Sequence, residues 1–296
     1  MFTPSSGWTP VYTSTGVPLN AISGVAGSVD VITAVGNAQT VVKGSGSSFA
    51  AAQIGGAGSN LLALWHTGPA EIWTTGTNGQ VWRTANGGTS WTNMNSGTNL
   101  TLRGIFGKGS QDVVAAGDNT NDARHWDGTD WQNANHGRGD AMYGVWASKA
   151  KFWVVGNSGD GATSPDPRNT WDNIHDVNGN SRLNAVSGVD DANVWGVTEA
   201  GGLYRYNEPA TQWDSITNVS NSNLRAMWVH SATEIWVAGV SGGNGIVYRC
   251  DANAQTYINQ STAELNQHAI TGIWGNGSGG VWMTANSGTN GVIYKR

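Results

Sequence analysis

The stretch Leu224-Arg225-Ala226-Met227-Trp228 is one of seven copies of a short pattern. The pattern is an apolar residue, a variable residue, Ala or Gly, an aliphatic residue, and then an aromatic residue or Ser. Successive copies end 40 to 46 residues apart, and so even a period predicts a repeat architecture. The copies end at Ser23, Trp65, Phe106, Trp146, Ser187, Trp228 and Trp274.

Each repeat carries three further strand patterns. A continuous apolar run such as 234–239 follows the first pattern, and it is typical of a strand that is covered on both faces. A third run resembles Val247-Tyr248-Arg249, and a single aromatic residue marks a fourth. Turn residues separate these runs. Four strands in about 40 residues are the pattern of a β-propeller blade, so we expect an all-β, seven-bladed propeller with four antiparallel strands per blade.

The seventh repeat reaches Arg296 after only three strand patterns. Its fourth strand must come from elsewhere in the chain. Residues 5–12, around Trp8, match the fourth-strand pattern around Trp91. We therefore expect residues 5–12 to complete the blade formed by about 266–296, so that residues 1–296 form a single propeller.

Composition excludes several classes of function. The formal net charge is −5 and the basic residues form no stripe, which argues against nucleic-acid binding. No apolar run approaches the length of about 18 residues that a membrane span needs. The single cysteine, Cys250, allows no internal disulfide.

Two short motifs resemble known propeller families. The stretch Thr84-Ala85-Asn86-Gly87-Gly88-Thr89-Ser90-Trp91 resembles the Asp-box of BNR-type propellers, with Asn86 in place of the usual Asp. The segment from Asn193 to Trp213 resembles a tectonin-type repeat of lectin propellers. These resemblances imply a carbohydrate-binding, lectin-like protein whose partners are glycans or cell-surface glycoconjugates. The alternative is a scaffold that binds protein, and a sialidase-like glycoside hydrolase comes third.

The arrangement of charged residues argues against an enzyme. No unique pair of carboxylates stands out for acid–base glycoside chemistry, and the six histidines lack metal-ligand spacing. Five of the ten arginines recur at equivalent positions, and we interpret them as architectural. These are Arg83, Arg205 and Arg249 in the third strand, and Arg103 and Arg225 in the first.

Four tryptophans at the end of the first strand have two interpretations. As repeated residues they pack between blades. Alternatively, some expose a ring face on which the apolar face of a sugar stacks, and several weak sites together give avidity. The sequence leaves both open for Trp65, Trp146, Trp228 and Trp274.

Polar loops in the third and fourth repeats depart from the pattern. We expect the connections 117–122 and 156–168 and the link 133–140 to lie on one face of the propeller, where binding loops usually occur. They are either plain solvated loops or a polar ligand site. We expect no cofactor; the alternative is calcium, with Asp118 and Asp122 as its ligands. The candidate ligand-binding residues are Asp118, Asp122, His136, Arg138, Asp140, Asp160 and Asp166.

The surface is rich in Asn, Ser, Thr and Gly and poor in Lys, which favours an extracellular or cell-surface location. Residues Met1 to Pro4 show neither the basic segment nor the apolar core of a signal peptide. We therefore expect a mature form or a domain of a longer protein.

Overall fold

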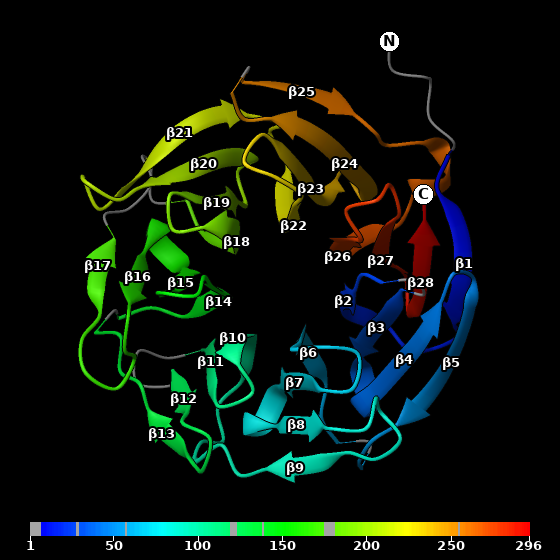
Figure 1. The fold of residues 1–296 in the computed structure, drawn as a ribbon. Coiled ribbons are helices and arrows are strands. Elements are labelled where there is room, and N and C mark those ends of the chain that lie inside the picture. Colours follow the sequence, from blue (N-terminus) through cyan, green and yellow to red (C-terminus); the bar gives the residue numbers. More distant parts are fainter. Residues whose placement is uncertain are drawn as a thin grey trace.

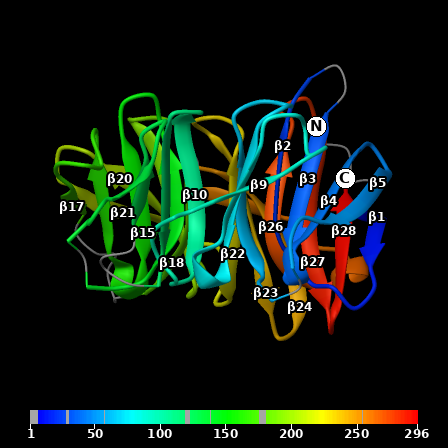
Figure 2. The same cartoon turned by 90° about the horizontal axis from the view of Figure 1, so that it is seen from below.

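Seven four-stranded antiparallel sheets surround a central channel, so the predicted seven-bladed propeller is confirmed (Figure 1). The computed structural model describes residues 7–27, 30–56, 58–118, 123–137, 139–174, 181–253 and 255–296. In the perpendicular view the sheets stand side by side as a disc, with the connections at its two faces (Figure 2).

Each blade runs from an inner strand that lines the channel to an outer strand at the rim. The first three blades contain β2 (Leu19–Val25), β3 (Val31–Gly36), β4 (Thr40–Ser45) and β5 (Ser48–Gln53); β6 (Leu61–His66), β7 (Ile72–Gly76), β8 (Val81–Thr84) and β9 (Thr92–Met94); and β10 (Leu102–Gly109), β11 (Asp112–Gly117), β12 (Arg124–Trp126) and β13 (Trp131–Asn133).

The next three blades contain β14 (Met142–Ala147), β15 (Phe152–Gly156), β16 (Gly161–Ser164) and β17 (Asp172–Ile174); β18 (Leu183–Asp190), β19 (Asn193–Thr198), β20 (Gly202–Asn207) and β21 (Gln212–Asn218); and β22 (Asn223–Val229), β23 (Glu234–Ser241), β24 (Asn244–Asp251) and β25 (Thr256–Asn259). Blade seven is β26 (Ala269–Gly275), β27 (Val281–Ser287), β28 (Asn290–Lys295) and β1 (Thr9–Ser14).

Helix within the described ranges consists of four short 3-10 turns: η1 (Asn37–Gln39), η2 (Thr77–Gly79), η3 (Asn157–Gly159) and η4 (Ala263–Leu265). None of these turns has the length or apolarity to cross a bilayer.

The blades interlock through tryptophans that lie against glycines. The Trp228 ring of blade six fills the space beside Gly275 of blade seven, where an added Cβ would lie 2.4 Å from the indole. The same contact joins Trp65 to Gly107, Trp146 to Gly188 and Trp274 to Gly24. Since only glycine leaves room for the ring, the first-strand pattern encodes the spacing between blades.

Third-strand arginines pack on second-strand tryptophans of the same blade. Arg83 is the cross-strand partner of Trp73, and its guanidinium lies 4.9 Å from the ring centroid. Its Nε also donates to Glu71 at 2.7 Å. Arg205 and Trp195 repeat this stacking at 5.7 Å in blade five. The architectural role predicted for these third-strand arginines agrees with this geometry.

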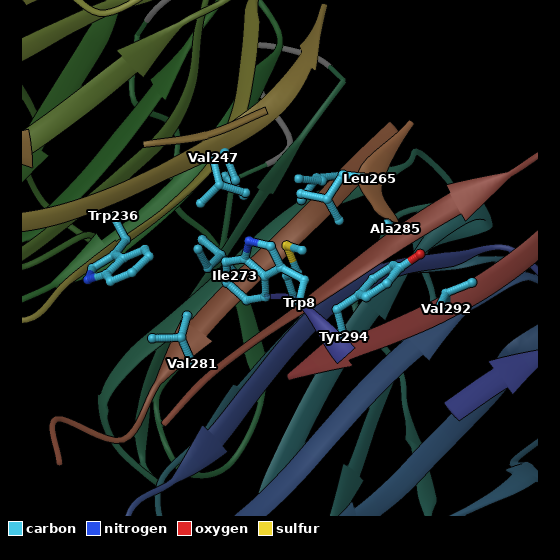
Figure 3. Packing of buried hydrophobic residues seen from close by; sticks show 13 residues of the cluster. Trp8, Trp236, Val247, Leu265, Ile273, Val281, Ala285, Val292 and Tyr294 are labelled. Carbon is cyan, nitrogen blue, oxygen red and sulfur yellow. The ribbon is translucent and has the colours of Figure 1, made fainter. Parts of the chain in front are cut away.

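The N-terminal strand closes the ring as predicted, although β1 begins at Thr9 rather than within residues 5–8 (Figure 1). Trp8 lies just before it, only 2% exposed, in the hydrophobic cluster between blades six and seven (Figure 3). The indole meets Trp236 edge-on at 6.5 Å, and its Nε1 donates to the Gln260 carbonyl at 2.9 Å.

The prediction that 156–168 forms one loop is wrong. Residues Gly161–Ser164 are the third strand of blade four, β16, and they pair with β15. The connection between the second and third strands is therefore only the η3 turn, which has the same length as the η1 and η2 turns of blades one and two. The segment 165–171 joins the third and fourth strands instead, at the opposite face of the propeller.

We expect deletion of residues 1–13 to cause a large loss of thermal stability or aggregation, because β28 would keep an unpaired edge and the apolar surface beneath Trp8 would be exposed. The milder variant Trp8→Ala should lower the free energy of unfolding by about 3–5 kcal/mol in chemical denaturation. Trp91→Ala removes the half-buried equivalent in blade two and should cost less. Wild-type stability of the truncated chain would contradict the closure.

His66 makes stability depend on pH. Burial lowers its pKa to about 4, and the charge of Lys43 acts in the same direction. As pH falls below the ordinary histidine pKa of about 6.5, His66 becomes protonated in the unfolded chain but stays neutral in the folded protein. Unfolding free energy should therefore drop by about 2 kcal/mol between about pH 7 and pH 5 from this residue alone. His66→Phe should remove that part of the dependence, and an unchanged slope would contradict the assignment.

Candidate functional site

The variable residue of the first-strand pattern points into one mouth of the central channel. A hollow of about 340 Å³ lies there, and all seven blades contribute to it. Below it the channel continues between the inner strands as a cavity of about 270 Å³. The seven residues of this ring are Asn20, Leu62, Arg103, Tyr143, Asn184, Arg225 and Thr271.

A repeated backbone hydrogen bond fixes the turns around this mouth. The residue after the second strand donates to the carbonyl just before the first strand, as in Asp118 to Thr101 at 3.0 Å and Glu199 to Arg182 at 3.0 Å. The same bond occurs in blades one, two and four. The turns after the second strands therefore place Asp118 and Glu199 at the rim of the channel mouth.

Three arginines gather on one side of the mouth. The guanidinium groups of Arg103 and Arg182 lie 5.2 and 4.7 Å from the ring centroid of Tyr143. Arg103 donates through Nε to Asp118, and Arg182 pairs with Glu199 at 3.1 Å. Because the ring face attracts cations and each carboxylate fixes one guanidinium, the arginines are held in position. We call Arg103, Arg182, Arg225 and Tyr143 the arginine cluster.

Arg225 supplies the unbalanced charge of the arginine cluster. Its side chain is exposed, and among the described residues no carboxylate pairs with it. Partial desolvation and the positive charge of Arg182 lower the pKa of its guanidinium. Among the described side chains, three cations against the carboxylates of Asp118 and Glu199 make this mouth positive on a protein of net charge −5. Such a site attracts an anionic group.

Sequence reasoning missed this cluster. The interpretation of Arg103 and Arg225 as architectural, which rests on their shared repeat position, is wrong, because both side chains line the channel mouth. Their position carries Asn, Leu, Tyr and Thr in other blades, so the scaffold does not demand arginine there. The variation of this second position, in a first-strand pattern that is otherwise uniform, was the sequence signal that could have identified the cluster.

The tryptophans predicted as possible sugar platforms pack between blades. Trp65 and Trp146 are 8% and 7% exposed, so their ring faces are covered. Trp228 and Trp274 are half-buried, each with its ring edge on a glycine of the following blade. The interblade interpretation therefore describes all four.

The predicted polar site does not assemble as one cluster. Asp118 pairs with Arg103 at the channel mouth, whereas His136 is buried with its ring edge-on to Trp171 at 6.4 Å. Asp140 and Asp160 are half-buried in separate connections. The remaining two candidates, Asp122 and Arg138, lie outside the described residues.

Asp166 lies on the face opposite the arginine cluster, because β16 intervenes. It belongs to a hairpin of the same plan as the Asp-box-like turn of blade two. The Asp166 N–H donates to the Ser164 hydroxyl at 3.1 Å, as Asn86 N–H does to Thr84 at 3.3 Å. Hydrogen bonding from Arg168 lowers the pKa of the Asp166 carboxyl. Asp166 is therefore occupied in stabilising its own turn.

The calcium hypothesis has little support in this geometry. Asp118 already accepts a hydrogen bond from a guanidinium, whose charge opposes a cation at the same place. Within the described ranges, no three His, Cys, Asp or Glu side chains come together as a metal site.

Comparisons with known proteins show the fold. No protein-family model and no curated protein matches the chain. Among solved structures, one described as YCF48 bound to D1 peptide has a TM-score of 0.75 at 14% identity, over 99% of this chain and 96% of that one. The WD40 repeats of RRP9 give 0.79 at 8% identity and 98% coverage of both chains. The WD40 propeller domain of Doa1 gives 0.75 at 12%, over 98% and 97%.

These neighbours correct two expectations. They are not tectonin-type or Asp-box lectins, so the resemblance holds for the propeller and not for those lectin families. The prediction of an extracellular or cell-surface location is also wrong. It rested on the surface composition, whereas the structures that share this fold are not extracellular lectins.

The blade-four hairpin allows a matched test of Asp166. Asp166→Ala should lower the melting temperature by a few degrees, because the turn loses its side-chain acceptor. Asp166→Asn should be nearly neutral, since an amide oxygen still accepts from the Arg168 backbone N–H, and Asn86 stands at the corresponding place in blade two, where it accepts from the Ser90 N–H at 2.9 Å. Thermal melts of both variants test whether Asp166 stabilises its turn. If Asp166→Ala melts at the same temperature as the wild type, Asp166 does not have this structural role.

Proposed function

We propose that this protein is a non-enzymatic recognition propeller that binds a partner protein through an acidic peptide segment at the arginine cluster. The observation that carries the proposal is the convergence of Arg103, Arg182 and Arg225 with Tyr143 at one mouth of the channel. Guanidinium groups bind carboxylates through paired hydrogen bonds, and the Tyr143 ring between Arg103 and Arg182 holds these cations in place.

The shape of the mouth supports a peptide. The hollow is open and about 340 Å³ in volume, with polar side chains from several blades around it. Asn184 already donates to Asn223 at 2.9 Å, so the ring presents ordered amide groups beside the cations. A similar fold is described as bound to a peptide, which agrees with this choice of partner.

The observations favour this hypothesis over carbohydrate binding. A lectin site needs an accessible aromatic face, and the repeated tryptophans use their rings between blades. At the channel mouth the ring of Tyr143 carries Arg103 and Arg182 instead. Cations that surround a ring select an anionic ligand rather than a neutral sugar.

A display library of short random peptides tests the proposal. Peptides selected on the purified protein should be enriched in Asp and Glu, and their binding should weaken as salt is raised. Arg225→Gln should weaken a selected peptide by about tenfold in calorimetry, the loss of one charge-assisted hydrogen bond. Arg103→Gln should have a similar effect.

Arg205→Gln is the matched control. It removes an equally charged side chain that stacks on Trp195 away from the channel, and peptide binding should be unchanged. Selection of peptides without acidic residues, or equal effects of Arg225→Gln and Arg205→Gln, would overturn the proposal.

A further inference from the structure

A second cavity, of about 560 Å³, lies between blades six and seven, on the face opposite the arginine cluster. Its volume is in the range of small-molecule and side-chain pockets. It shares no lining residue with the channel mouth, so a ligand in this cavity would bind independently of the proposed peptide. The residues used below are Trp228, Glu234, Trp236, Arg249, Ile258 and Arg296.

The equivalent junction between blades two and three is filled. There Trp126 pairs with Val113 across the sheet and lies 5.8 Å from Trp73 of blade two, which also contacts Trp131 at 6.0 Å. In blade seven the N–H of Arg296 bonds to the carbonyl of Val281, the counterpart of Val113. Arg296 thus takes the place of the Trp126 indole.

The substitution of a cation for an indole changes the chemistry of the junction. The Arg296 guanidinium lies 5.3 Å from the ring of Trp236, as Trp126 lies on Trp73. On the blade-seven side, Gly277, Gly279 and Gly280 line the cavity without side chains. The junction between blades two and three is therefore closed by a tryptophan cluster, whereas the junction between blades six and seven is open and positively charged.

The charges in this cavity are unequal. Glu234 accepts hydrogen bonds from Arg249 at 2.5 Å and from Trp236 Nε1 at 3.0 Å, so both of its oxygens are engaged. Arg296 donates to the side chain of Gln260. Burial and the charge of Arg249 lower the pKa of the Arg296 guanidinium. Among the described side chains of the lining, two guanidinium groups thus face one carboxylate, that of Glu234.

The apolar part of the wall lies beside these cations. Ile258 is 51% exposed, which is unusual for a large aliphatic side chain, and the half-buried Trp228 adds an aromatic edge. Figure 3 shows Trp236 and Val281 at the margin of the hydrophobic cluster that contains Trp8. A ligand that covers Ile258 and Trp228 would bring its anionic end to Arg249 and Arg296.

We propose that this cavity binds an apolar carboxylate, a ligand whose aromatic or aliphatic group contacts Ile258 and Trp228 while its carboxylate accepts hydrogen bonds from Arg249 and Arg296. The same chemistry occurs in a free small molecule and at the carboxyl end of a peptide. In both cases the carboxylate restores the charge balance that Glu234 alone does not provide.

Calorimetry on the full chain tests the proposal with N-acetylphenylalanine, its amide, and the tripeptide Gly-Gly-Phe. The acid should bind at least about tenfold more tightly than the amide, because only the acid carries the charge. Binding of N-acetylphenylalanine identifies a small-molecule source, and binding of Gly-Gly-Phe alone identifies a peptide end. Equal binding of acid and amide, binding of a neutral methyl glycoside in their place, or no binding of any probe would overturn the proposal.

Two variants locate the binding. Arg296→Trp rebuilds the arrangement of Trp126, and it should abolish binding of the acid without lowering the melting temperature. Arg296→Gln keeps the cavity open and should weaken binding by about tenfold. Lys295→Gln is the control, since that lysine stacks on Trp282 outside the cavity and its loss should leave the affinity unchanged. Retained binding in both Arg296 variants would place the ligand elsewhere.

Discussion

The seating of a tryptophan on a glycine of the next blade is the contact on which the rest of this propeller depends. It joins four of the seven junctions, with indole atoms 2.4 to 3.0 Å from where a Cβ would stand. The glycine cannot be replaced while the tryptophan is present, because a side chain at its position would overlap the ring. At these four junctions one blade therefore fixes the angle of the next, and the pairing of β1 with β28 closes the ring that they form.

This constraint explains why so much of the fold was predictable from the sequence. The glycines and tryptophans recur with the apolar runs, so strand number, blade number and the closing strand followed from their period. The exception was β16, Gly161–Ser164, whose small residues give no apolar signal. Because strands alternate in direction, missing one strand moved Asp166 to the wrong face of the molecule.

The candidate site was harder to predict for a related reason. A repeated position identifies a place in the scaffold, but it does not show which way the side chain points. Arg83 and Arg103 both occupy repeated positions, yet Arg83 lies across Trp73 within its sheet and Arg103 faces the channel. Only the closed ring brings Arg103, Arg182 and Arg225 together, because these residues are 43 to 122 positions apart in sequence.

The contact between a cation and an aromatic ring has two roles in this protein, and the surroundings of the ring distinguish them. Where a cation lies on a second-strand tryptophan, as Lys295 lies on Trp282, the ring is buried in the hydrophobic cluster between blades seven and one. At the channel mouth the ring is Tyr143, half-buried, with two guanidinium groups on it and Arg225 beside them. Stacking within a blade covers a core aromatic, whereas stacking at an open mouth holds cations at the surface. Because like charges held together repel one another, an anionic group placed among them would reduce this repulsion, and the proposed peptide binding relies on the same charge–ring contact that elsewhere stabilises the fold.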